Sequence, residues 1–156
     1  MLMTAQPLYD AITNLKKNNN GPVIFLTPQG KVWTQSKAEQ FSKKYEEVII
    51  LCGRYEGIDQ RIRDSLVDIE ISIGKYVLTG GEIGAMALVD SISRLIPNVI
   101  GKEDSHLEDS FSKKLNRKKE YPQYTRPAEF NGMKVPDILL SGHHKKIQDW
   151  KEKNSN

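Results

Sequence analysis

The stretch Ile71-Ser-Ile-Gly-Lys-Tyr-Val-Leu-Thr-Gly-Gly-Glu82 decides the fold of this 156-residue chain. Its β-branched residues favour a strand that stops at Gly80-Gly81, and a long amphipathic segment begins at Glu82. Two adjacent glycines let a ligand approach the main chain closely, because no Cβ stands in the way. The first N–H groups of a helix have no intrahelical partner. The sequence therefore predicts a strand-to-helix corner that binds a ligand through its main chain.

Two further corners of this kind precede it. The apolar run Val48–Cys52 ends at Gly53-Arg-Tyr-Glu-Gly57, and the run Val23–Leu26 ends at Thr27-Pro-Gln-Gly30. In open α/β sheets, ligands bind in the crevice outside the carboxyl ends of the strands. We expect the three corners to meet in one binding site.

The apolar periodicity predicts an α/β fold with a parallel sheet. Helical spacing covers residues 1–20, Thr34–Tyr45, Ile58–Leu66 and Glu82–Ile96, and strand-like runs lie at Val23–Leu26, Val48–Cys52 and Val67–Leu78. In the last helix one face is apolar, with Ile83, Met86, Val89, Ile92 and Ile96. This face is buried either in the core of the monomer or against a second subunit.

Composition narrows the class of protein. With 156 residues, 38% of them hydrophobic, the chain can build one packed core. Cys52 is the single cysteine, and the sequence shows no leader-like segment and no long apolar span, so we expect a cytoplasmic protein without a membrane segment. His106, His143 and His144 do not have the spacing of metal ligands, so no metal site is expected.

The charge is uneven along the chain. The net charge of +3 comes from residues 101–156, where the run Lys113-Lys-Leu-Asn-Arg-Lys-Lys119 lies. Such a run suits a polyanion such as RNA, or it is a solvated and mobile stretch. Residues 101–132 lack periodicity and are predicted to be a linker or loop. Ser141 is predicted to cap a last helix that contains Ile147 and Trp150.

Dinucleotide binding is one reading of the glycine corners. However, the chain has no Gly-x-Gly-x-x-Gly and no Gly-Lys-Ser/Thr motif, and Glu56 and Glu82 stand where phosphate oxygens would lie. A neutral or cationic ligand fits these corners better than a phosphate does.

Six strings, in order, resemble one family. Phe25–Gly30, Cys52–Asp59, Ser72–Glu82, Glu108–Phe111, Tyr124–Pro127 and Val135–Gly142 are similar to the bacterial tRNA (guanine-37-N(1))-methyltransferases, the TrmD family. The resemblance covers nearly the whole chain. It implies a SPOUT fold, in which the parallel sheet has helices on both faces and residues 1–100 end in a trefoil knot. It also implies that residues 133–156 begin a C-terminal helical tRNA-binding domain. Family members extend beyond both ends of this sequence, so the chain is expected to be a shortened member.

The resemblance also implies ligands and roles. S-adenosyl-L-methionine would be the methyl donor, and its binding residues would be Gly53, Ile73, Gly74, Lys75, Tyr76, Val77 and Leu78, with Leu26, Pro28, Glu56, Gly80 and Gly81 close by. Asp109 would be the general base and Arg94 the cation that stabilises negative charge on the guanine. From the residues alone, Asp109 is better interpreted as a helix N-cap or as one more charge in an acidic loop. Arg94 is alternatively a partner of Asp90 on the helix surface.

The resemblance further implies a homodimer in which Asp109 would serve the donor bound by the other subunit, with tRNA as the substrate. Two positions differ from many relatives: Ile83-Gly84 replaces Leu-Pro, and Lys75 replaces an acid. Three functions therefore stay open. They are an active methyltransferase, a donor-binding but catalytically weak fragment, and an RNA-binding scaffold without chemistry.

Overall fold

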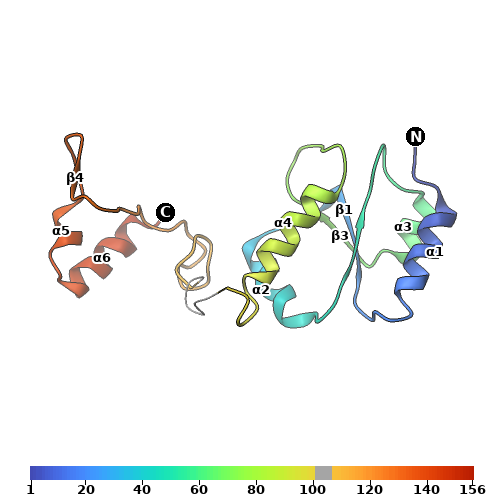
Figure 1. The fold of residues 1–156 in the computed structure, drawn as a ribbon, viewed down its shortest axis with the longest axis horizontal. Helices are drawn as coiled ribbons and strands as arrows, with labels where there is room; N and C mark the ends of the chain where they lie inside the picture. Colours follow the sequence, from blue (N-terminus) through green and yellow to red (C-terminus); the bar gives the residue numbers. More distant parts are fainter. Residues whose placement is uncertain (101–106) are drawn as a thin grey trace. The chain divides into compact units, whose positions relative to one another are not determined.

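The computed structural model describes residues 1–100 and 107–156, and the chain divides into two compact units, Met1–Gly101 and Lys102–Asn156 (Figure 1). The first unit alternates helices and strands. Its elements are α1 (Ala5–Leu15), β1 (Val23–Val32), α2 (Gln35–Lys44), β2 (Ile49–Cys52), α3 (Gln60–Leu66), β3 (Ile69–Ser72) and α4 (Glu82–Ser93).

The sheet of the first unit is parallel and has the order β2-β1-β3. Val23 of β1 pairs with Ile49 of β2, and Ile24 pairs with Ile69 of β3. The predicted α/β fold with a parallel sheet is confirmed. β1 is longer than the predicted strand and shifts its register against β3 between Leu26 and Lys31.

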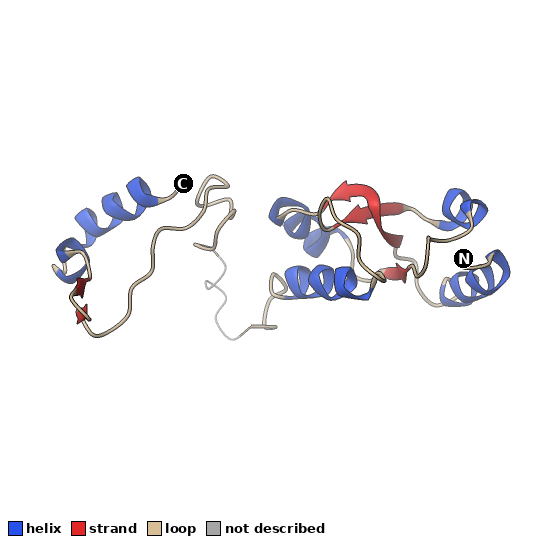
Figure 2. Cartoon of the chain, turned by 90° about the horizontal axis from the view of Figure 1, so that it is seen from above, coloured by secondary structure: helices blue, strands red, loops and turns tan. Residues whose placement is uncertain are grey.

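Helices cover both faces of this sheet, α1 and α3 on one face and α2 and α4 on the other (Figures 1 and 2). Successive residues of a strand point to opposite faces. Val23 and Phe25 of β1 accordingly pack in one cluster with Leu8 of α1, while Ile24 packs in the other with Leu88 of α4. The first four residues of β1 are therefore buried on both sides, as their unbroken apolar sequence predicts.

β3 ends earlier than predicted, at Ser72 instead of Leu78. The Ser72 hydroxyl donates to the Gly74 carbonyl oxygen (2.8 Å) and accepts from the Gly74 N–H (3.2 Å). These bonds close a turn directly after the strand. Residues 73–79 therefore form a loop, which leads from the sheet to α4.

Only part of the apolar face predicted for α4 packs on the sheet, because Ile92 contacts the core and the other residues of that face on the helix do not. Ile83, Met86 and Val89 are 55, 63 and 53% exposed, whereas Gly84 and Leu88 are buried. A Cβ at Gly84 would lie 2.9 Å from Leu26 Cδ1, so the helix packs closely through its glycine. Within the first unit the more apolar side of α4 therefore faces solvent.

The second unit contains a hairpin and two helices. Its elements are β4 (Glu129–Phe130), β5 (Met133–Lys134), α5 (Asp137–Leu140) and α6 (His144–Asn154). β4 lies inside the stretch predicted to be a linker. It pairs with β5 in an antiparallel hairpin, whose tight turn is formed by Asn131 (φ 51°) and Gly132 (φ 78°).

The cap predicted at Ser141 is wrong. His143 is the N-cap of α6, and Ser141 is the C-cap of α5. The Ser141 hydroxyl donates to the Ile138 carbonyl oxygen (2.7 Å) and accepts from the His143 N–H (3.3 Å). Ser141 thus stabilises the turn between the two helices.

Candidate functional site

A cavity of about 600 Å³ lies at the carboxyl ends of β2 and β3 and beside β1. All three predicted corners line it. Thr27–Gln29 come from the first corner, Gly53–Gly57 from the second, and Gly80-Gly81 from the third. The loop that follows β3 also forms part of the wall, through Ile73, Gly74 and Tyr76–Thr79.

The residues predicted to bind the donor line this cavity, with the exception of Lys75. They are Leu26, Pro28, Gly53, Glu56, Ile73, Gly74, Tyr76, Val77, Leu78, Gly80 and Gly81. Their contact with a methyl donor stays a prediction. Since a single cavity gathers segments from three separate parts of the sequence, these residues are able to act on one ligand.

Two of the corners contact each other through their main chains. The Gly81 N–H donates to the Gly53 carbonyl oxygen (3.0 Å), and Gly80 forms an isolated antiparallel bridge with Arg54. A Cβ at Gly81 would lie 2.8 Å from Cys52 Cα. This approach requires glycine, because backbone atoms on the opposite side cannot give way as a flexible side chain can.

An ion pair spans the same two corners. Arg54 Nε and Nη2 both lie 2.8 Å from Glu82 Oε1. The pKa of Glu82 lies below its usual value. The larger cause is a hydrogen bond from the main chain, and the smaller is the hydrogen bond from Arg54. The Glu82 carboxylate is therefore charged, and its charge is compensated by a residue that the sequence analysis did not single out.

Arg63 is a second cavity residue that the sequence analysis did not assign. Its guanidinium donates to both carboxylate oxygens of Glu70, and Nη1 donates to Gln29 Oε1 (2.5 Å). The guanidinium carbon lies 5.8 Å from the centre of the Phe25 ring. Hydrogen bonds from Arg63 lower the pKa of Glu70. This part of the wall is thus polar but compensated in charge.

The two predicted catalytic residues belong to different units. Arg94 is the C-cap of α4, its main-chain N–H donates to the Asp90 carbonyl oxygen (3.2 Å), and it does not line the cavity. Asp109 lies in the second unit, where its carbonyl oxygen accepts from the Ser112 N–H (3.1 Å). The carboxylate oxygen Oδ2 of Asp109 is buried. The catalytic roles of both residues stay predictions.

Two residues of the basic run, Lys114 and Arg117, bind other residues of the loop in which they lie. Lys114 Nζ lies 2.7 Å from Glu108 Oε1, and Arg117 Nη1 donates to the Phe111 carbonyl oxygen (2.9 Å). Asn116 and Arg117 both have positive φ, at 52° and 66°. Both side chains are exposed to solvent, and their hydrogen bonds fix them within the loop.

Within residues 1–100 and 107–156 no helix has the length and apolarity needed to cross a membrane. Across the same ranges no three acidic, histidine or cysteine side chains gather as metal ligands would. His106 lies outside the described residues.

Comparison with known proteins identifies the relatives of the chain. The family model described as "tRNA (Guanine-1)-methyltransferase TrmD" matches residues 1–156. The tRNA (guanine-N(1)-)-methyltransferase of Clostridioides difficile is 56% identical over 99% of this chain and 67% of the relative. Those of Halalkalibacterium halodurans and Geobacillus kaustophilus are 55% and 53% identical over 99% of this chain and 62% of each relative.

The chain thus spans about three fifths to two thirds of the length of these relatives. The matched range nevertheless includes the three corners, Arg94 and Asp109. The chain belongs to the TrmD family of tRNA (guanine-1)-methyltransferases.

Proposed function

We propose that the protein transfers a methyl group from S-adenosyl-L-methionine to N(1) of guanine 37 in tRNA. The observation that carries the proposal is the main-chain cradle of Gly53 and Gly80-Gly81, which lines a cavity of about 600 Å³ in a chain of this family. The bound donor would supply an electrophilic methyl group on a sulfonium. The remaining chemistry falls to side chains of the protein.

The wall of the cavity suits this donor. Ile73, Val77 and Leu78 provide apolar surface for an adenine and a thioether chain. The Glu56 carboxylate adds negative charge that favours a sulfonium, and the charge of Arg63 is already compensated by Glu70. The negative charge of a pyrophosphate would find no unpaired Arg63 to neutralise it and would lie near the Glu56 carboxylate. The walls therefore favour a methyl donor over a dinucleotide.

Methylation at N(1) of guanine removes a proton from a weakly acidic ring nitrogen and moves negative charge onto the neighbouring oxygen. We propose that Asp109 accepts the proton and that Arg94 stabilises the oxygen. A positioned base typically contributes a factor of about 10²–10⁴ in rate. A cation directed at the developing charge acts in the transition state, where it is most effective.

The test is a radiolabelled methyl-transfer assay. We expect label in tRNA that carries guanine 37 and none in the same tRNA with adenine 37. The assay compares this chain with a version joined to the remaining segments of a relative, because relatives are longer. We expect weak turnover in the chain alone and full turnover in the longer version. Transfer to both tRNAs, or to neither by the longer version, would overturn the proposal.

We further propose that the protein shares the finer features of its family. These are the trefoil knot of the donor-binding domain in residues 1–100, a linker in 101–132, a tRNA-binding helical domain that begins in 133–156, and a place in the cytoplasm. Family membership and the parallel sheet with helices on both faces support the knot. Relatives named as tRNA enzymes support the tRNA partner.

We also propose that the protein is a homodimer. Ile83, Met86 and Val89 recur at helical spacing on α4 and are each more than half exposed, and Val77 in the preceding loop is 82% exposed. Large exposed apolar side chains that gather on one face mark an interaction site. A second copy of the chain is the occupant that family membership favours.

Replacing Met86 by Glu is expected to convert the dimer to a monomer at micromolar concentration, because burying an unpaired carboxylate in an apolar interface is unfavourable. Light scattering measures the mass. The control is Leu15→Glu, which changes a similarly exposed residue (52%) on α1. A wild-type chain that is monomeric, or a Met86→Glu variant that keeps the dimer mass, would contradict the proposed interface.

A further inference from the structure

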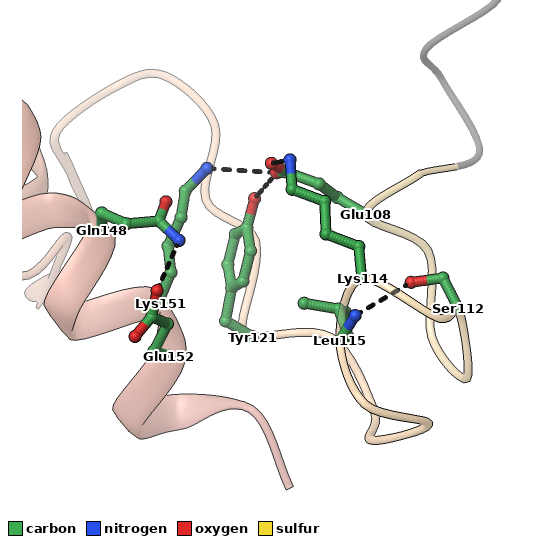
Figure 3. A network of polar contacts seen from close by, with 8 residues as sticks. All are labelled: Glu108, Ser112, Lys114, Leu115, Tyr121, Gln148, Lys151 and Glu152. Carbon is green, nitrogen blue, oxygen red and sulfur yellow. Dashed lines mark hydrogen bonds and ion pairs between the residues drawn. The ribbon is translucent and has the colours of Figure 1, made fainter.

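Glu108, the residue directly before Asp109, is the centre of a polar network in the second unit (Figure 3). Its Oε1 accepts a hydrogen bond from Lys114 Nζ (2.7 Å). Its Oε2 accepts from the Tyr121 hydroxyl (3.1 Å) and lies 3.5 Å from Lys151 Nζ. Three donors from different parts of the unit therefore converge on one carboxylate.

The side chains behind Glu108 are themselves fixed by packing. Tyr121 is only 9% exposed, and Lys151 Nζ lies 4.5 Å from the centre of its ring. The Trp150 ring meets the Tyr121 ring edge-on, with centroids 6.5 Å apart. Lys151 and Trp150 belong to α6. The network thus ties the segment around Glu108 to Tyr121 and to a regular helix.

The loop after Glu108 closes on itself. The Phe111 N–H donates to the Lys118 carbonyl oxygen (2.7 Å), and the Glu120 N–H donates to the Ser110 hydroxyl (3.0 Å). The Ser112 N–H donates to the Asp109 carbonyl oxygen (3.1 Å). Asp109 is accordingly held from both sides, by Glu108 before it and by this closed loop after it.

We infer that Glu108 is a positioning residue for Asp109: by binding Lys114, Tyr121 and Lys151, its carboxylate fixes the backbone from which the Asp109 carboxylate projects. This inference rests on the proposed function, in which Asp109 is the base. Precise placement of a base matters, since a misplacement of about 1 Å can cost on the order of 100-fold in rate.

Glu108 itself is poorly suited to be the base. Hydrogen bonds from Lys114 and Tyr121 lower the pKa of Glu108 to about 2. A carboxylate with so low a pKa has little tendency to accept a proton near neutral pH. Of the two adjacent acids, Glu108 is therefore suited to a positioning role, and Asp109 is the proposed base.

The first test measures methyl transfer in the longer version of the protein. Glu108→Gln is expected to lower kcat on the order of 100-fold, with the KM for tRNA changed less than threefold. The pH dependence of kcat should keep the apparent pKa of the wild type, because the base itself is retained. A shifted apparent pKa would make Glu108 the titrating group and overturn its positioning role.

A matched pair of lysines separates positioning from attraction of RNA. Lys114→Met and Lys113→Met each remove one charge from the same basic run. Both side chains are exposed, but Lys114 is the one that binds Glu108. We expect kcat to fall about tenfold more in Lys114→Met than in Lys113→Met. Tyr121→Phe, which keeps the ring on Lys151, should also lower kcat. Equal effects of the two lysine variants, confined to KM, would overturn the inference.

Hydrogen exchange provides a readout that does not depend on activity. The Ser112 amide, which bonds to the Asp109 carbonyl, should exchange roughly tenfold faster in the Glu108→Gln form of this chain, because the segment before it is released. Unchanged exchange would show that Glu108 does not hold Asp109.

Asp109→Asn is assayed in parallel with these variants. If Asp109→Asn keeps its activity, the base assignment fails and the positioning role fails with it. If Asp109→Asn loses activity while Glu108→Gln keeps the wild-type kcat, the proposed function stands and only the positioning role is overturned.

Discussion

Replacing Asp109 by Asn is expected to lower the rate of methyl transfer by a factor of about 10²–10⁴, the usual contribution of a positioned base. The carboxamide has the same shape as the carboxylate but cannot accept the proton from N(1) of guanine. Single-turnover assays with saturating donor and guanine-37 tRNA measure the rate of this step. The affinity for S-adenosylhomocysteine should stay within about twofold of the wild type, because this change touches only the chemistry.

The control for this prediction is Asp149→Asn. Asp149 is an exposed carboxylate on α6 in the same unit, so its replacement removes the same charge without touching the loop of Asp109. We expect the Asp149 variant to keep at least half of the wild-type rate. Robust transfer by Asp109→Asn would assign the proton to another group and refute this role.

The parallel sheet and the cavity were predictable because their signals are local. Strands buried on both faces are continuous apolar runs, and both Val23–Leu26 and Ile49–Cys52 have this form. The glycines lie directly in the corners that they shape. Since the carboxyl ends of parallel strands meet at one edge, the corners had to gather there.

The orientation of α4 was not predictable from periodicity. The helix has two sides that both contain apolar residues, one with Ile83, Met86 and Val89 and one with Gly84 and Leu88. Periodicity favours the side with more apolar surface. The packed side is instead chosen by shape, because Gly84 admits the Leu26 side chain to close contact. Such a choice depends on a residue 58 positions away, which a pattern within the helix does not contain.

The compensated charges of the cavity were missed for a related reason. Arg54 pairs with Glu82 across 28 residues of sequence, and Arg63 reaches Gln29 across 34. A charged residue beside a strand or helix is interpreted as a surface residue when its partner is far away in the sequence, because the sequence does not show the pairing. Only the fold shows that Arg54 and Arg63 line the cavity.

Replacing Gly81 by Ala is expected to weaken donor binding on the order of 100-fold. The new Cβ would lie 2.8 Å from Cys52 Cα and 3.1 Å from the Gly53 nitrogen, so the corner must move away from β2. That movement would break the hydrogen bond from the Gly81 N–H to the Gly53 carbonyl oxygen. Backbone strain of about 3 kcal/mol corresponds to roughly this loss of affinity. Titration calorimetry with S-adenosylhomocysteine measures it.

Alanine variants of two neighbouring glycines, Gly53 and Gly80, are expected to lose less affinity than Gly81→Ala. A Cβ at Gly53 would meet the Phe25 ring at 3.0 Å, and a Cβ at Gly80 would meet the side-chain ends of Glu82 and Arg54. A ring or a flexible side chain gives way more easily than backbone, so we expect the loss of affinity to fall in the order Gly81→Ala, Gly53→Ala, Gly80→Ala. Thermal unfolding of each variant shows whether the fold is kept. If folded Gly81→Ala bound the ligand as tightly as Gly80→Ala, main-chain contact between the two corners would not be what shapes the site.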